Sequence, residues 1–168
     1  SGKELSQREI AKLLKVSPTA IGKSIKKLEK EKYAKITKKN NINVNFVSLF
    51  RENQNALLLK RVENLKLIYE SGLCDFLEES FPGSTIILFG SYSKGDDLFS
   101  SDIDIAIMGS TGSKGSKKIE INRKPFEKML ERQINMNHYQ TLKDVHKELK
   151  ENLCNGIVLF GGIEFWDL

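Results

Sequence analysis

Cysteine, histidine and long apolar runs are scarce in this chain, and each shortage argues against a class of protein. The two cysteines, Cys74 and Cys154, show neither a Cys-x-x-Cys spacing nor the spacing of metal ligands. We expect reduced thiols in the core of a cytoplasmic protein rather than a disulfide framework. His138 and His146 have no obvious partner with which to bind a metal. No apolar run approaches the roughly 18–20 residues of a membrane-spanning helix, and no signal peptide is recognised, which argues against an integral membrane protein.

Acidic residues are scarce in one region, the first 47 residues. There the chain has 12 basic and 4 acidic residues, a net charge of +8, whereas the rest has 15 basic and 18 acidic residues, a net charge of −3. The overall charge of +5 therefore conceals two unlike blocks. We expect a basic module at residues 1–47 and a second module at residues 48–168, in which residues 48–81 form a helical connector. The first two residues, Ser-Gly, resemble the remnant of a cleaved tag, so we expect part of the basic module to be missing.

Two helix starts lie close together in the basic module. Ser6 and Glu9 have the spacing of a capping box, and apolar residues recur after them at helical intervals, which predicts a helix over residues 7–15. Ser17 followed by Pro18 is a second start signal, for a helix that extends to residue 31. Two helices joined by so short a turn are the outline of a helix-turn-helix.

The second of these helices has one apolar face and one cationic face. At 100° per residue, Ile21, Ile25 and Leu28 form a narrow apolar stripe. The opposite face consists of Thr19, Lys23, Lys26, Lys27 and Lys30. Such a face predicts contacts with the phosphate backbone of DNA, and the alternative is a solvated face on a protein-interaction or spacer module.

A segment with strand-like alternation follows the two helices. Residues 33–37 and 42–46 alternate with period two around a polar turn at residues 38–41, which predicts a β-hairpin. With the two helices, and above all in QREIAKLLKVSPTAIGKSIKKLEKE, this module resembles the winged helix-turn-helix of prokaryotic regulators. Such domains normally have a further helix in front, which agrees with a missing N-terminal part.

The second module begins with helical sequence and a strand that leads into a glycine–serine turn. From about residue 47 to residue 81 apolar residues recur at threes and fours, and Gly72 is expected to end the first helical stretch. Residues 85–89, TIILF, are typical of a buried strand and run directly into GSYSKG. In that turn Gly90 allows close approach of the backbone, Ser91 offers a hydrogen bond and Lys94 a charge. A strand followed by Gly-Ser at a helix start predicts a phosphate-binding loop.

Two carboxylates lie on the next strand. Residues 100–107, SSDIDIAI, predict a strand with Asp102 and Asp104 on one face. Carboxylates so placed repel each other, and a hard divalent cation such as Mg²⁺ would offset the repulsion by binding oxygens from both. An exposed edge strand with solvated acids is the alternative interpretation.

Together, GSYSKG and SDIDIAI resemble the nucleotidyltransferases of the DNA polymerase beta superfamily, especially its minimal prokaryotic members, over about residues 75–137. The resemblance implies an α+β chain whose mixed β-sheet is flanked by helices, and chemistry on a nucleoside triphosphate such as ATP. It also implies that Gly90 and Ser91 hold the β- and γ-phosphates. Asp102 and Asp104 would bind two Mg²⁺ (or Mn²⁺) ions that span the phosphates and the attacking hydroxyl, in agreement with two-metal catalysis.

The chain departs from the family pattern at a third carboxylate, which a later strand supplies and which helps to activate the acceptor hydroxyl. A helix predicted over residues 126–131 and a strand predicted over residues 132–138 place Asn135, or Asn137 on the same face, at that position. An amide can offer an oxygen to a cation but cannot serve as a base. Glu120 and Glu131 are the acids near this position in the sequence.

The remaining segments say less about function, and the sequence as a whole leaves three possible functions for the protein. Residues 108–118 predict a loop, residues 141–152 a helix that ends at Asn155-Gly156, and residues 157–166 one or two core strands. The first function is a Mg²⁺-dependent nucleotidyltransferase acting on a hydroxyl of protein, nucleic acid or a small molecule. The second is a DNA-binding transcriptional regulator that binds nucleotide with little or no turnover. The third is an antitoxin-like partner that modifies or sequesters another protein.

Overall fold

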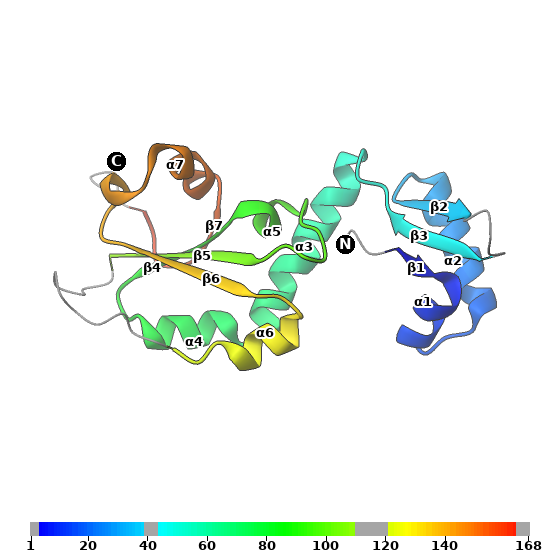
Figure 1. Cartoon of the computed structure of the whole chain (residues 1–168), viewed down its shortest axis with the longest axis horizontal. Helices are drawn as coiled ribbons and strands as arrows, with labels where there is room; N and C mark the ends of the chain where they lie inside the picture. The colour runs from blue at the N-terminus through cyan, green and yellow to red at the C-terminus, as the bar shows by residue number, and fades with distance from the viewer. Residues whose placement is uncertain (1–3, 39–43, 110–120, 164–168) are drawn as a thin grey trace.

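Two groups of elements, joined by the long helix α3 (Gln54–Glu70), make up the chain in the computed structural model (Figure 1). The structure describes residues 4–38, 44–109 and 121–163. The N-terminal group contains a three-stranded sheet of order β1-β3-β2, and the second group contains a four-stranded sheet of order β6-β5-β4-β7.

The N-terminal group follows the predicted helices closely. Its elements are β1 (Leu5–Ser6), α1 (Gln7–Leu13), α2 (Pro18–Lys30), β2 (Ala34–Lys38) and β3 (Asn45–Leu49). The predicted capping box is confirmed, because Ser6 Oγ accepts from the Glu9 amide at 3.2 Å and Glu9 Oε2 accepts from the Ser6 amide at 2.7 Å. Ser17 Oγ likewise accepts from the Ala20 amide at 3.2 Å, which caps α2. Local side-chain chemistry therefore sets both helix starts.

Two predictions for this group were wrong. Leu28 is 42% exposed, so the buried stripe of α2 is limited to Ile21 and Ile25, which pack with Ala11 in a small core. The second strand was predicted over residues 42–46, but β3 extends to Leu49 and so includes residues 48 and 49, which had been assigned to the helical connector. The reason is strand pairing, because the antiparallel register with β2 continues until Leu49 lies opposite Ala34. Of the polar turn predicted at residues 38–41, Lys38 belongs to β2, and the other three residues lie outside the described residues.

The second group is a mixed sheet covered by helices on both faces, as the fold class predicted. After α3 its elements are α4 (Leu73–Ser80), β4 (Thr85–Phe89), α5 (Gly90–Lys94), β5 (Ile103–Met108), α6 (Lys124–Leu130), β6 (Ile134–Tyr139), the 3₁₀ helix η1 (Leu142–Asp144), α7 (Lys147–Cys154) and β7 (Ile157–Phe160). β5 pairs antiparallel with β4 and parallel with β6, while β7 pairs antiparallel with β4. The predicted strand at residues 85–89 is confirmed at both ends.

Alternation along the strands divides the apolar side chains between two clusters. Ile86, Leu88 and Ile105 face α3, α4 and α6 in the larger cluster, which also holds Ile68 of α3. Ile87 and Ala106 face the other way, toward η1 and α7. Figure 1 shows the same arrangement, with α4 and α6 on one side of the sheet and α7 on the other. Burial on both faces explains why β4 is apolar at every position.

Of three further predictions, about Gly72, the helix over residues 141–152 and the two cysteines, the structure confirms some and contradicts others. Gly72, at φ +74°, separates α3 from α4 as predicted. The helix predicted over residues 141–152 is broken, because Val145 has an extended backbone and is buried in the second cluster, so that α7 starts only at Lys147. Of the two free thiols, Cys74 is buried as expected but Cys154 is exposed.

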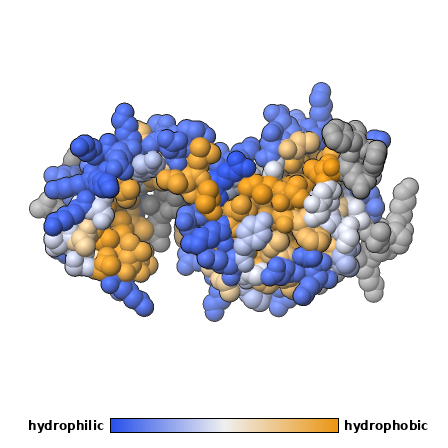
Figure 2. All heavy atoms as spheres, turned by 180° about the vertical axis from the view of Figure 1, so that it is seen from behind, coloured by the Kyte–Doolittle hydropathy of each residue, from blue (hydrophilic) through white to orange (hydrophobic). Residues whose placement is uncertain are grey.

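The exposed surface includes one apolar region on α3. Figure 2, which views the molecule from behind, shows apolar side chains gathered across the middle of this face, where α3 lies. The large apolar side chains of α3 that are exposed are Leu58, Leu59, Val62, Leu67 and Tyr69. Within residues 4–38, 44–109 and 121–163, no helix combines the length and the apolar character needed to cross a membrane.

Candidate active site

The glycine–serine turn begins where β4 ends. Gly90 has φ +75°, a conformation that L-residues rarely adopt, and the hydroxyl of Ser93 donates to the Gly90 carbonyl at 2.8 Å to close the turn. A Cβ added to Gly90 would come within 2.5 Å of Asp104 Oδ2. Both the backbone angle and the neighbouring carboxylate therefore require glycine here. Ser91 follows in α5 and is half-buried, and none of the described residues hydrogen-bonds to its hydroxyl.

Three side chains meet beside this turn: Asp104 of β5, Asn135 of β6, and Asp102, which directly precedes β5 because the strand predicted over residues 100–107 starts only at Ile103. Asp104 of β5 lies opposite Phe89 in the antiparallel register and opposite Asn135 in the parallel one. Asn135 Nδ2 donates to Asp102 Oδ2 at 3.0 Å and to Asp104 Oδ1 at 3.3 Å. The structure thus brings Asp102, Asp104 and Gly90 together, and it places Asn135 against both acids, as the strand spacing had predicted. The alternative Asn137 lies opposite Ala106, two residues farther along the strand.

The two carboxylates form a site with unbalanced negative charge. Burial raises the pKa of the Asp104 carboxyl above its ordinary value, the hydrogen bond from Asn135 opposes that rise, and the charge of Asp102 adds to it. The uncharged amide of Asn135 therefore links the carboxylates of Asp102 and Asp104 by hydrogen bonds but does not neutralise the charge of either one. Glu131 is exposed at the end of α6, and Glu120 lies outside the described residues.

The donor set is of a kind that Mg²⁺ can use. In the described part of the chain, no group of three or more His, Cys, Asp or Glu side chains gathers in a metal-binding arrangement. Mg²⁺ is typically held by one or two carboxylates, with waters and substrate phosphates completing its shell. Two converging carboxylates next to a glycine turn supply the protein part of such a shell, and Asp102 and Asp104 are the residues that would hold the ion.

Lys94 does not join the carboxylates. Its Nζ donates instead to Asn152 Oδ1 of α7 at 2.9 Å. The side chain of Lys94 is exposed, so in this conformation it ties α5 to α7 rather than lying over the turn. The expectation that Lys94 adds charge to a phosphate site thus requires this contact to break.

The five residues of the predicted nucleic-acid face lie on α2, in the N-terminal group. All are exposed, namely Thr19, Lys23, Lys26, Lys27 and Lys30. Three of them, Thr19, Lys23 and Lys26, line a hollow of about 400 Å³ that also touches Gln7 and Ile36. The cationic face is therefore continuous with a groove between α2 and the small sheet.

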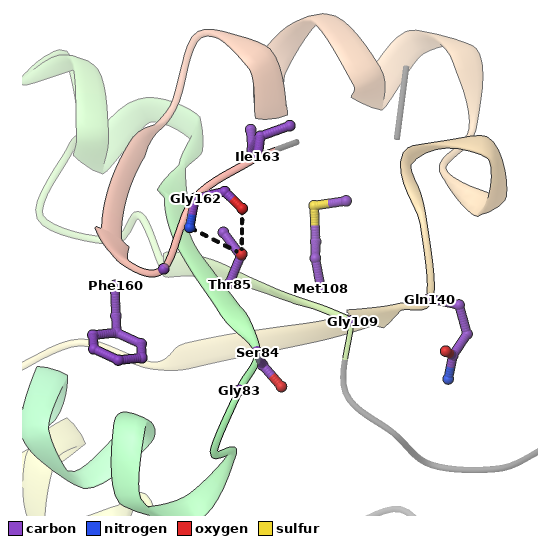
Figure 3. Close-up of a pocket in the computed structure, with 10 residues that line it drawn as sticks. Gly83, Ser84, Thr85, Met108, Gly109, Gln140, Phe160, Gly162 and Ile163 are labelled. Atoms are coloured by element: carbon purple, nitrogen blue, oxygen red, sulfur yellow. Dashed lines mark hydrogen bonds between the residues drawn. The ribbon is translucent and has the colours of Figure 1, made fainter. Parts of the chain in front are cut away.

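A second hollow lies away from the carboxylates. It has a volume of about 330 Å³ and is lined by residues that include Thr85, Met108 and Gly162 (Figure 3). Thr85 Oγ1 donates to the Gly162 carbonyl at 2.8 Å and accepts from its amide at 3.2 Å. Thr85 pairs with Met108, whereas Phe89 pairs with Asp104, so this hollow is at the opposite end of the two strands. It does not belong to the candidate active site.

A buried polar cluster near the site was missed by sequence reasoning. Asp97 is 1% exposed and accepts hydrogen bonds from Lys60 Nζ at 2.6 Å and Asn64 Nδ2 at 2.8 Å. One signal could have found it. Lys60 and Asn64 continue the four-residue spacing of the buried residues Ala56 and Ile68 on α3, so they interrupt an otherwise apolar buried face.

The family model of the polymerase beta nucleotidyltransferases matches residues 73–162, a range that contains the glycine turn, both aspartates and Asn135. A crystal structure of a candidate nucleotidyltransferase from Sulfolobus solfataricus is 22% identical, with 61% of this chain and 84% of that chain covered and a TM-score of 0.33. None of the curated proteins matches the chain.

Proposed function

The chain belongs to the polymerase beta nucleotidyltransferase family, and from this premise we propose that it transfers a nucleotide from a Mg²⁺-bound nucleoside triphosphate to an acceptor hydroxyl. One observation carries the proposal. Asp102 and Asp104 converge on one point, with Gly90 so close to Asp104 that no side chain fits between them. Phosphate and cation would therefore meet at the same edge of the sheet.

The residues divide the work between binding and orientation. The backbone of Gly90 and the hydroxyl of Ser91 bind phosphate oxygens, since Gly90 lets the main chain approach the ligand closely. Asp102 and Asp104 hold the cation, which stabilises charge on the entering and leaving oxygens when bound. Asn135 keeps the two carboxylates side by side. Such a site works by placement and charge, without a covalent nucleophile.

Asn135 favours a second candidate function, in which the domain senses nucleotide with little turnover. Its amide cannot take the proton of an acceptor hydroxyl, so the step that a third carboxylate would assist proceeds without that base. In this form the protein is a DNA-binding regulator or an antitoxin-like partner. The five exposed residues of α2 support a contact with DNA. We propose that residues 1–47 form a winged helix-turn-helix, whose small sheet is completed by β3.

Label transfer from nucleotide to acceptor tests the first function. The full chain is incubated with ATP labelled at the α-phosphate, Mg²⁺ and candidate acceptors from three classes: protein, nucleic acid and small molecules. We expect labelled acceptor with the wild type and none with Asp104→Asn. Asp75→Asn, an exposed carboxylate on α4, is the matched control and should transfer at the wild-type rate.

Two results would count against the assignment. Transfer that survives in Asp104→Asn would show that the chemistry lies elsewhere. Nucleotide binding without transfer to any acceptor class, together with tight DNA binding, would favour the regulator instead.

A further inference from the structure

Asp102 is held by a segment that has no regular secondary structure of its own. Residues 96–102 connect α5 to β5 and form neither helix nor strand. All of them are exposed or half-buried except Asp97, whose side chain is 1% exposed. Asp97, five positions before Asp102, is the one residue of this range with a buried side chain and serves as its anchor; the preceding Gly95 is also buried, and Arg51 donates to the carbonyls of Asp96 and Asp97.

The anchor is bound from α3. Lys60 Nζ lies 2.6 Å from Asp97 Oδ1, and Asn64 Nδ2 donates to the same oxygen at 2.8 Å. Asn64 Nδ2 also donates to the Tyr92 carbonyl at 2.9 Å, which ties α5 to the same point. Lys60 adds a hydrogen bond to the main-chain carbonyl of Asp97, so both the side chain and the backbone of the anchor are fixed.

The other carboxylate oxygen of Asp97 faces the start of β6. Arg132 Nη2 lies 3.8 Å from Asp97 Oδ2, and the guanidinium also lies over the Phe99 ring at 4.8 Å. The side chains of Lys60 and Arg132 are only 12% and 11% exposed, so two largely buried cations lie beside one fully buried carboxylate. Arg132 precedes Asn135 by three residues. The anchor is thus linked to the strand that supplies the amide between the carboxylates.

A tight turn joins the anchor to Asp102. The Ser101 amide donates to the Leu98 carbonyl at 3.1 Å, and the Leu98 amide donates to Ser101 Oγ at 2.9 Å. The next amide after Asp102, that of Ile103, donates to the Gln133 carbonyl at 2.8 Å. With a closed turn on one side and a strand on the other, Asp102 has little freedom once Asp97 is fixed.

Buried ions are an expensive way to stabilise a fold. Removing these charges from water costs several kcal/mol per ion, and apolar residues of similar volume often stabilise a protein as well or better. The hydrogen bonds to Asp97 Oδ1 do, however, fix one geometry, because they have preferred directions, although Asp97 Oδ2 and Arg132 Nε have no hydrogen-bond partner among the described residues. This contrast points to a geometric role for the cluster.

We propose that Asp97, held by Lys60, Asn64 and Arg132, is a positioning residue that sets the place of Asp102 beside Asp104 and Asn135. The consequence for cation binding and transfer rests on the function proposed above, whereas the positioning itself does not. Helix α3 is then part of the site, although none of its residues touches the carboxylates that would hold the cation.

The side-chain amide of Asn135 reports on this geometry directly, since it donates to both Asp102 and Asp104. Its two N–H resonances are recorded in ¹H–¹⁵N spectra of the full chain and identified by their absence in Asn135→Ala. The test variants are Asp97→Asn and Lys60→Met. Lys66→Met is the matched control, because Lys66 lies on the same helix but pairs with Glu63 and Glu70 at the exposed surface.

In both test variants we expect the Asn135 resonances to move toward those of a solvent-exposed amide, and in Lys66→Met we expect no shift. Titration with MnCl₂ should show an affinity about 10-fold to 100-fold lower than in the wild type, the usual effect of losing a residue that orients a metal ligand. If Asp97→Asn does not fold, Lys60→Met decides the question.

A folded Lys60→Met protein with wild-type Asn135 resonances would overturn the proposal, even if its melting temperature is lower. A wild type that binds no Mn²⁺ would instead contradict the metal part of the proposed function. The Asn135 resonances would still decide whether the Asp97 cluster positions Asp102, so the two failures are distinguishable.

Discussion

Replacing Gly90 by alanine should have two effects: backbone strain at the turn and a direct clash with the carboxylate of Asp104. The substitution puts a Cβ on a residue at φ +75°, which costs about 1–2 kcal/mol for an L-residue. It also places that Cβ 2.5 Å from Asp104 Oδ2, closer than two such atoms can approach. The carboxylate must therefore rotate away, and its 3.3 Å hydrogen bond from Asn135 Nδ2 is lost.

The chain contains a matched control for the strain alone. Gly72 has φ +74°, and a Cβ added there would meet no atom within 4 Å. Gly72→Ala should therefore cost the same backbone strain, about 1–2 kcal/mol, without changing the candidate active site. In a chain of 168 residues each kcal/mol lowers the melting temperature by about 2–4 °C, so both variants should melt roughly 2–8 °C below the wild type.

Thermal unfolding, Mn²⁺ titration and label transfer are then measured on both variants. We expect similar melting temperatures, but loss of Mn²⁺ binding and of transfer only in Gly90→Ala. Transfer by Gly90→Ala at the rate of Gly72→Ala would refute the reasoning, because the glycine turn and Asp104 would not then act as one site.

Three further predictions concern charge. Because burial raises the pKa of Asp104, the native state holds a proton that the unfolded chain has already lost, so stability falls as pH rises from the ordinary to the raised pKa. Asp104→Asn should then melt higher than the wild type at pH 7 without divalent cations, and the difference should vanish below about pH 4; a lower melting point at pH 7 would contradict the sign. Asn135→Asp should speed transfer by on the order of 100-fold if a missing base limits it, and should lower the melting point without cations; an unchanged rate would rule out that limit. Lys23→Ala/Lys27→Ala should weaken DNA binding and reduce its salt slope by roughly one unit per lysine, as measured by fluorescence anisotropy at several salt concentrations, whereas a salt-independent affinity would favour a protein contact.

The features predicted correctly from sequence depend on signals within a few residues. Ser6 and Ser17 cap their helices through neighbours three residues away, so the capping pattern was sufficient. The strand from Thr85 to Phe89 was evident because burial on both faces selects a continuous apolar run. Period-two alternation predicted that Asp102 and Asp104 lie together, and they do, although β5 starts only at Ile103 and the predicted strand was too long at its start; the next strand in the sequence brought Asn135 to both.

The features missed depend on partners distant in sequence. The end of β3 is set by its register with β2, and residues 48 and 49 carry no strand signal of their own. Val145 interrupts a helical pattern because the cluster under η1 and α7 buries it, which outweighs local propensity. Lys94 donates a hydrogen bond to Asn152, 58 residues later in the chain, and no repeating sequence pattern indicates such a contact. Long-range packing decided each of these cases.

The Asp97 cluster has a consequence for where the domain begins. The family match starts at residue 73, after α3 has ended, and it contains Asp97, Asp102, Asp104 and Asn135. Yet Lys60 and Asn64, which hold Asp97, both lie on α3. A fragment restricted to the matched residues would keep the residues that face the ligand and lose those that orient Asp102. The N-cap of the same helix is Asn53, whose side chain donates to the Lys32 carbonyl of the N-terminal group at 2.8 Å. α3 thus belongs structurally to both groups. Experiments on the two aspartates, or on the cationic face of α2, therefore require the full chain.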